Sequence, residues 1–201
     1  ECVRFVRLLR DTRYDLVIDF QGLLKSAVWF DLRALYGPAA WIDELRQDFL
    51  ARVKANPRFI RQWVEQHLQT GVALNWFGGL ATENTGGRET LDIKHAGTAI
   101  AVEAARILAL TCGLSCTSTV ERLQYAGRQL GIPEAEYQGW VTAFMYLQTL
   151  RLRQQILATD APDLANRLDA AHLNLVDRQM IKSAFRAIRT LQQRLQMDHM
   201  R

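Results

Sequence analysis

The spacing of apolar residues predicts helices along most of the chain. After Pro38, apolar residues recur at helical steps as far as Val53, and Asn56-Pro57 ends this helix and begins the next. Residues 99–112 are apolar on nearly all sides, so we expect this helix to be central and buried. Further helices are predicted over residues 119–130, from residue 133 to residue 158, and from the segment LNLVDRQ to the C-terminal end.

The ends of two of these helices carry recognisable signals. Ser118 and Glu121 have the spacing of a capping box, in which the serine hydroxyl accepts from the backbone amide three residues on while the glutamate reaches back. Pro38 is suited to a first helical turn, because the N–H that proline lacks is not needed there. These signals, together with the short connections between helices, favour an antiparallel bundle.

Two stretches depart from the helical pattern. Residues 71–96 are rich in glycine, threonine and asparagine and predict a long irregular loop, extended at TLDIK, with a small hairpin as an alternative. Residues 16–20, LVIDF, resemble a short strand, but no later segment supplies the strands that a parallel sheet requires. We therefore expect residues 16–20 to be an isolated extended piece or to be drawn into a helix.

The predicted fold is all-α: an antiparallel helical bundle with a long irregular loop over residues 71–96 and a short N-terminal extended segment. The 201 residues are enough for one generous domain or two small ones, and a hydrophobic content of 49% fits a globular chain. The net charge of +4 comes from basic residues spread singly along helices, which is typical of solvated helix faces. We therefore expect no nucleic-acid partner.

Cysteines and apolar runs bear on the location of the protein. Cys112 and Cys116 are four residues apart without a further Cys or His pair, so they form neither a disulfide framework nor a zinc site. We expect them to be reduced thiols of a cytoplasmic protein. The most apolar run is interrupted by Glu103 and Arg106, so we expect no contact with a membrane.

Several charged residues occur where the periodicity predicts burial. Asp92 and Lys94 alternate to one side of an extended segment, which predicts either a structural salt bridge or an acid and a base that face a ligand. Glu103 and Arg106 are three apart on a helix, which favours an ion pair. Arg122 follows the capping box without a structural explanation and is a candidate to point into the bundle.

Arg151 is the least expected of these charges, because it lies on the apolar stripe of the helix that begins at residue 133. Gln154 continues that line one turn later, and Arg153 lies to one side. Arg151 is expected either to lock the bundle by bonding to carbonyls and carboxylates, which we favour, or to meet an anionic ligand such as a phosphate.

The sequence shows no arrangement that would make the chain a catalyst by itself. No nucleophile lies near a base, the glycine pairs do not form a phosphate loop, and the histidines lack the spacing of a metal site. A Gly-Ser motif with paired carboxylates, which metal-dependent nucleotidyl transfer requires, is absent from the sequence. We therefore predict no catalytic residues and no metal ligands.

Residues from about 30 to 197 resemble a known family. The matching segments are FDLRALYG, LDIKHAGTAIAVEAARILAL, STVERL, AFMYLQTLRLRQQ and LNLVDRQMIKSAFRAIRTLQQRL. In this order they are similar to the substrate-binding domain of nucleotidyltransferases. In that family the domain is the helical C-terminal part of bacterial signalling proteins, which often carry cyclic-nucleotide-binding and CBS modules.

The resemblance implies a helical domain beside a catalytic domain that resembles the protein-PII uridylyltransferases. The catalytic motif of such proteins lies upstream of the matched region, so Mg²⁺ and a nucleoside triphosphate are expected only for that domain, and no cofactor for this chain. The expected partners are the catalytic domain in the same protein and a protein or nucleotide substrate. The family commonly has a histidine where Gln154 stands, so a role that needs an imidazole is not expected. The residues implied in substrate binding are Asp92, Lys94, Arg106, Arg122, Arg151 and Arg153.

The first 28 residues resemble a different family. The segment RYDLVIDFQGLLKSA is similar to the early strand, turn and helix of lipopolysaccharide heptosyltransferases, whose sugar-nucleotide site lies mostly in a C-terminal half that this chain lacks. We expect a chimera-like junction between a fragment over residues 1–28 and a helical domain over residues 29–201. The alternatives to a substrate-binding domain are a heptosyltransferase fragment and a purely structural helical interaction module.

Overall fold

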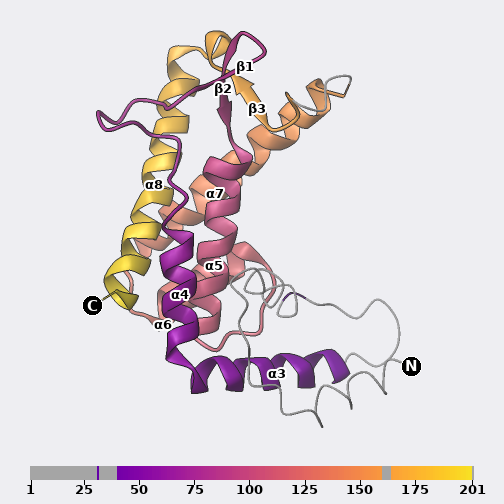
Figure 1. Cartoon of the computed structure of the whole chain (residues 1–201), viewed down its shortest axis with the longest axis vertical. Helices are drawn as coiled ribbons and strands as arrows, with labels where there is room; N and C mark the ends of the chain where they lie inside the picture. The colour runs from indigo at the N-terminus through magenta and orange to yellow at the C-terminus, as the bar shows by residue number, and fades with distance from the viewer. Residues whose placement is uncertain (1–30, 32–39, 160–163, 201) are drawn as a thin grey trace.

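The computed structural model describes residue 31, residues 40–159 and residues 164–200. Six α-helices contain most of these residues (Figure 1). The prediction of a mostly helical fold is confirmed. The helices are α3 (Ala40–Ala55), α4 (Pro57–His67), α5 (Ala99–Thr111), α6 (Thr119–Gln129), α7 (Glu134–Leu157) and α8 (Leu175–His199). The expected extended piece at residues 16–20 lies outside the described residues.

The helices begin where local chemistry favours a start. Pro57 occupies the beginning of α4, directly after the end of α3. Ser118 caps α6, with its hydroxyl accepting from the backbone N–H of Glu121 at 3.5 Å, as the sequence predicted. Asn174 caps α8 in the same way, with its Oδ1 2.8 Å from the backbone nitrogen of Asp177.

The prediction of a purely α-helical fold is wrong, because three short strands form an antiparallel sheet in the order β1-β2-β3. The hairpin considered for the loop exists as β1 (Glu83–Thr85) and β2 (Arg88–Asp92). The third strand, β3 (Arg167–Asp169), pairs with β2 so that Leu91 faces Leu168. The sheet lies at one end of the bundle, and α3 lies at the other (Figure 1).

The segment between the sheet and the central helix is a π-helix, η1 (Lys94–Thr98), which continues directly into α5. Eight of the thirteen residues of α5 are buried, which confirms the expectation of a central helix. Apolar side chains from α4, α6, α7 and α8 pack around α5 and form a first core cluster. A second cluster continues the core to the sheet. The largest members of the second cluster include Leu91, Ile93, Phe144, Leu147 and Phe185.

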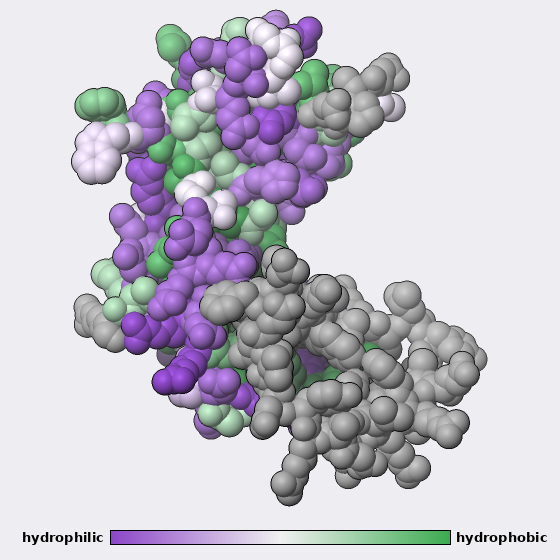
Figure 2. Space-filling model, viewed as in Figure 1, coloured by the Kyte–Doolittle hydropathy of each residue, from purple (hydrophilic) through white to green (hydrophobic). Residues whose placement is uncertain are grey.

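The loop between α4 and β1 is anchored at its base and exposed at its tip. Leu74 forms a β-bridge with Leu80, and its carbonyl accepts from the Arg189 guanidinium at 3.0 Å. The tip carries Trp76 and Phe77, each 94% exposed. This loop projects to the left in Figure 1, and Figure 2 shows green and near-white side chains standing out in the same place. Among the described residues, no helix is both long and apolar enough to cross a membrane.

Candidate functional site

The structure separates the six residues implied in substrate binding into two groups and a single residue. Asp92, Lys94 and Arg151 belong to the elements at the sheet end of the bundle. Arg106 and Arg122 share a carboxylate between α5 and α6. Arg153 is exposed on α7 and, within the described ranges, has no hydrogen-bond or ion-pair partner.

Asp92 closes β2 and caps the π-helix that follows. Its carboxylate accepts from the backbone N–H groups of Lys94 and His95 at 3.0 and 2.8 Å, and the His95 ring lies 3.0 Å away. Burial would raise the pKa of Asp92, but the hydrogen bonds from His95 and the charges of His95 and Arg167 outweigh it and hold the pKa below its usual value.

The salt bridge predicted between Asp92 and Lys94 does not form, because Asp92 is already satisfied by His95, by backbone amides and by Arg167 at 3.6 Å. The Lys94 ammonium therefore has no hydrogen-bond or ion-pair partner among the described residues. Its side chain is half-buried, beside the sheet, at the start of η1.

Arg151 ties α7 to the segment that enters β3. Its Nε donates to Oδ1 of Asn166 at 2.7 Å, and the backbone carbonyl of Asn166 accepts from Ile93 at 3.1 Å. Gln154, one turn later, donates to the carbonyl of Leu164 at 3.1 Å. These contacts fit the interpretation that Arg151 locks the bundle, although its partner is an amide rather than a carboxylate.

One face of the small sheet is polar and is held together by Arg167. Its Nη1 lies 2.7 Å from Oε2 of Glu83, 3.1 Å from Oγ1 of Thr85 and 3.3 Å from Oγ1 of Thr90, so a single guanidinium spans all three strands. The hydrogen bond to Glu83 raises the pKa of Arg167, and the charges of Glu83 and Asp92 act in the same direction. Arg167 is thus a fixed positive charge on this face.

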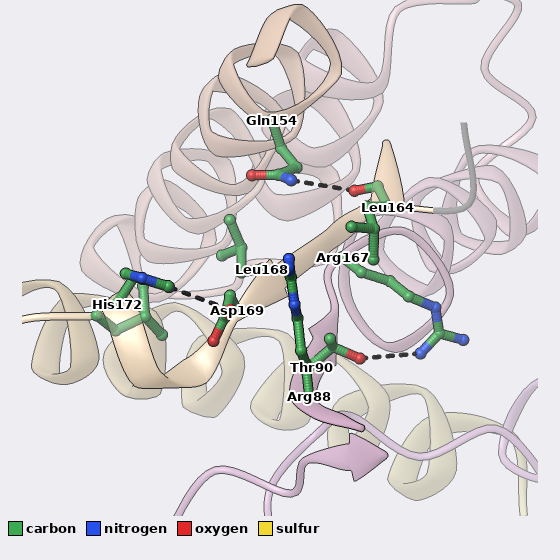
Figure 3. A pocket seen from close by; sticks show the side chains of 9 residues that line it. Arg88, Thr90, Gln154, Leu164, Arg167, Leu168, Asp169 and His172 are labelled. Atoms are coloured by element: carbon green, nitrogen blue, oxygen red, sulfur yellow. Dashed lines mark hydrogen bonds and ion pairs between the residues drawn. The ribbon is translucent and has the colours of Figure 1, made fainter. Parts of the chain in front are cut away.

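A cavity of ≈250 Å³ opens beside this polar face (Figure 3). Leucine side chains form its apolar wall, and its polar lining comes from β2, β3, α7 and the 3-10 turn η3 (Ala170–His172). In Figure 3 the Arg88 side chain stands near the middle of the view, with the Arg167 guanidinium to its right and His172 to its left. The lining residues are Arg88, Thr90, Gln154, Leu164, Arg167, Leu168, Asp169, His172 and Leu173.

The charges in this cavity are unevenly satisfied. The Asp169 carboxylate accepts from the backbone N–H of Ala171 at 2.9 Å and lies 3.1 Å from the His172 ring. The bond to Ala171 lowers the pKa of Asp169, helped by His172 and by the charge of Arg88. Arg88 itself is exposed and has no hydrogen-bond or ion-pair partner in the described part of the chain. The cavity therefore offers a guanidinium whose hydrogen-bond donors have no partner among the described residues.

The second group is built around Asp31, which the sequence analysis did not single out. Its carboxylate lies 2.5 Å from Nη2 of Arg106 and also forms an ion pair with Arg122. The Arg122 side chain is 1% exposed, and its Nε donates to the carbonyl of Cys116 at 2.8 Å. Arg122 therefore does point into the bundle, as the sequence suggested.

The ion pair predicted between Glu103 and Arg106 does not form, because each of the two side chains contacts another part of the fold. Glu103 accepts from the indole of Trp63 at 2.8 Å and lies 2.9 Å from Nδ1 of His67, both on α4, while Arg106 turns to Asp31. Burial opposes the charge of Glu103, but the hydrogen bonds from His67 and Trp63 prevail and lower its pKa. Both charges are thus structural, with partners that join separate helices.

The cavity residues Arg88, Arg167 and His172 were missed by sequence reasoning. Arg88 follows the pair Gly86-Gly87, whose positive φ angles of 59° and 82° allow the tight hairpin turn, and this glycine pair was the available signal. Arg167 and His172 had none, because they lie in a turn region with no periodic pattern. Within the described residues, no cluster of three or more His, Cys, Asp or Glu side chains is placed to hold a metal ion.

Comparison with known proteins adds one finding about ancestry. Residues 57–199, more than two thirds of the chain, match the family model described as "Putative nucleotidyltransferase substrate binding domain". This range contains the helices from α4 to α8, the sheet and the cavity. No curated protein and no solved structure gives a significant match. The resemblance of residues 1–28 to heptosyltransferases has no support in these comparisons and lies outside the described residues.

Proposed function

Because the chain belongs to the family of nucleotidyltransferase substrate-binding domains, we propose that it is the substrate-binding and regulatory part of a bacterial signalling protein. In this role the chain does not catalyse the transfer itself. It works beside a nucleotidyltransferase catalytic part of the same protein, which would hold Mg²⁺ and the nucleoside triphosphate. The proposal places the whole protein in the cytoplasm and includes CBS or cyclic-nucleotide-binding modules as regulatory neighbours.

The observation that carries this proposal is the gathering of polar groups at the sheet end of the bundle. Asp92, Lys94 and Arg151 belong to the elements that meet there, and the cavity with Arg88 opens on the same sheet. Two cationic side chains at this end, Lys94 and Arg88, have no partner among the described residues. Cationic side chains whose hydrogen-bond donors are not already taken by a carboxylate are available to bind an anionic substrate.

A purely structural module is the second candidate, and it is favoured by the other arginines. Arg106 and Arg122 both pair with Asp31, and Arg151 is bonded to Asn166. These three side chains act within the bundle and do not need a ligand to explain them. The two candidates therefore differ in what they predict for Lys94→Ala. A binding role predicts weaker ligand binding, and a structural role predicts a changed melting temperature.

Isothermal titration calorimetry of the chain with each of the four common nucleoside triphosphates, in the presence of Mg²⁺, tests the proposal. We expect binding heat that weakens in Lys94→Ala without a change in melting temperature. Arg58→Ala is the matched control, because Arg58 is an exposed cation in the first turn of α4, which lies at the α3 end of the molecule (Figure 1). The absence of heat with every nucleotide, and with the catalytic part added, would contradict the proposal.

A further inference from the structure

We infer that the cavity beside β2 and β3 is a phosphate site, which holds the phosphate end of a nucleotide-like ligand between Arg88, Arg167 and His172. This inference rests on the proposed function and deepens it, because it names the chemical group that the substrate presents and the residues that receive it.

The first step is the balance of charge in the cavity. Two arginines and a histidine line it with one carboxylate, Asp169, and Arg167 also pairs with Glu83 and Asp92 outside the lining. The Asp169 carboxylate is already engaged by the backbone of Ala171 and the ring of His172. Arg88 has no hydrogen-bond or ion-pair partner in the described ranges, so its donors are free to bind an anion without first breaking a native contact.

The second step is the fit between donors and ligand. A guanidinium presents a planar fork of N–H groups that matches phosphate oxygens, and such charge-assisted bonds are among the stronger ones in proteins. Arg167 is held by Glu83, Thr85 and Thr90, so its positive charge stays in place when a ligand arrives. Among the described residues, Arg88 is the donor without a native partner and Arg167 is the fixed one.

The third step is the rigidity of the opposite wall. His172 belongs to the turn η3, whose first residue, Ala170, accepts from Nη2 of Arg178 on α8. The Nε of the same arginine donates to the carbonyl of Leu173 at 3.1 Å. Arg178 therefore fixes the backbone on both sides of His172, so little backbone freedom is lost when a ligand binds there.

The size of the cavity limits what enters it. Pockets that enclose a whole small molecule measure about 300–1,000 Å³, and this cavity of ≈250 Å³ lies below that range. A phosphate group fits this volume, whereas the rest of a nucleotide would lie outside the cavity. The leucine side chains give the cavity an apolar surface on one side, where the attraction between the arginines and a bound anion is screened less than in open solvent.

The test is calorimetry of the 201-residue chain with inorganic pyrophosphate and, separately, with ATP, comparing wild type with Arg88→Ala, Arg88→Lys and Arg58→Ala. We expect both ligands to bind the wild type and the Arg58→Ala control equally. Arg88→Ala should weaken both by about tenfold or more, the usual consequence of losing a hydrogen bond between charged groups. Arg88→Lys, which keeps the charge but not the fork, should recover part of the loss.

Two results would overturn the inference. Equal binding of ATP to Arg88→Ala and to wild type would mean that the phosphate binds at another site, and the proposed function would not be contradicted. If pyrophosphate and ATP both fail to bind the wild type, the cavity is not a phosphate site, and the proposed function would then depend on a protein substrate. Thermal unfolding of each variant, measured beside the titrations, separates loss of binding from loss of folding.

Discussion

Asp31 and Arg122 form an ion pair that joins a residue near the N-terminus to the first turn of α6, 91 positions along the chain. Arg106 on α5 shares the same carboxylate. The Arg122 side chain is 1% exposed, and the Asp31 carboxylate is one of the groups that compensate its charge. A charge buried this deeply is tolerated only when it is paired and hydrogen-bonded.

Replacing Asp31 with alanine should therefore destabilise the fold. Removing one partner of a buried ion pair costs about 3–5 kcal/mol, because the buried charge that remains loses part of its compensation. Urea denaturation of Asp31→Ala measures this loss. Asp48→Ala is the matched control, since it removes an aspartate whose pair with Arg52 is exposed and is worth at most about 1 kcal/mol. Equal losses in both variants would show that Asp31 does not anchor the arginines.

Two helical glycines should respond to alanine with opposite signs. A Cβ atom at Gly127 would lie 2.6 Å from the ring of Tyr137, whereas one at Gly139 meets nothing within 4 Å. We expect Gly127→Ala to lower stability by about 1–3 kcal/mol through overpacking between α6 and α7. Gly139→Ala should raise it by up to about 1 kcal/mol through helix propensity. Melting temperatures of the two variants check this, and a shift in the same direction would contradict the packing.

Glu103 should make stability depend on pH. Its pKa in the folded chain is lowered from the ordinary value of 4.5. A carboxyl with a lowered pKa stabilises the fold above its unfolded pKa, and this contribution is lost as the pH falls towards the folded value. Glu103→Gln should therefore be less stable than wild type at pH 7, and the gap should narrow below about pH 4.5.

Urea denaturation of both proteins from pH 7 down to pH 3.5 measures that gap. Glu44→Gln serves as the control, because Glu44 is exposed on α3 and has no hydrogen-bond partner among the described residues. A gap that stays constant over this range would mean that Glu103 owes its role to shape rather than to charge.

Arg151 and Arg153 give a further pair of variants. Arg151→Ala removes the bond of 2.7 Å to Asn166 and should cost about 1–3 kcal/mol. Arg153→Ala changes an exposed side chain and should stay within about 0.5 kcal/mol of wild type. The free energy of unfolding of each variant gives the answer, and a large loss in Arg153→Ala would reveal a partner outside the described residues.

The helices were predictable from sequence because their signals are local. Pro57 and Ser118 act within one turn of their own positions, and the structure places helix starts beside both. The apolar periodicity of α5 likewise needs no knowledge of its neighbours, since a helix that is apolar on all sides must be buried.

The missed features depend on partners that are distant in sequence. β3 is a three-residue strand in a turn region, and only its pairing with β2 makes it a strand. Glu103 and Arg106 were assigned to each other because they are neighbours on one helix, yet both found partners elsewhere in the fold. The two groups of site residues could not be told apart for the same reason, because Asp31, which joins Arg106 to Arg122, is far from both in the sequence.

The small sheet has a consequence for behaviour at high concentration. Its two edge strands, β1 and β3, are three residues long, and exposed Glu83 and half-buried Arg167 place opposite charges along them. Long, flat and apolar edges recruit further strands from other molecules, whereas short charged edges give an incoming strand few backbone groups to pair with. The chain therefore keeps a β-sheet on its surface while offering little template for fibril growth.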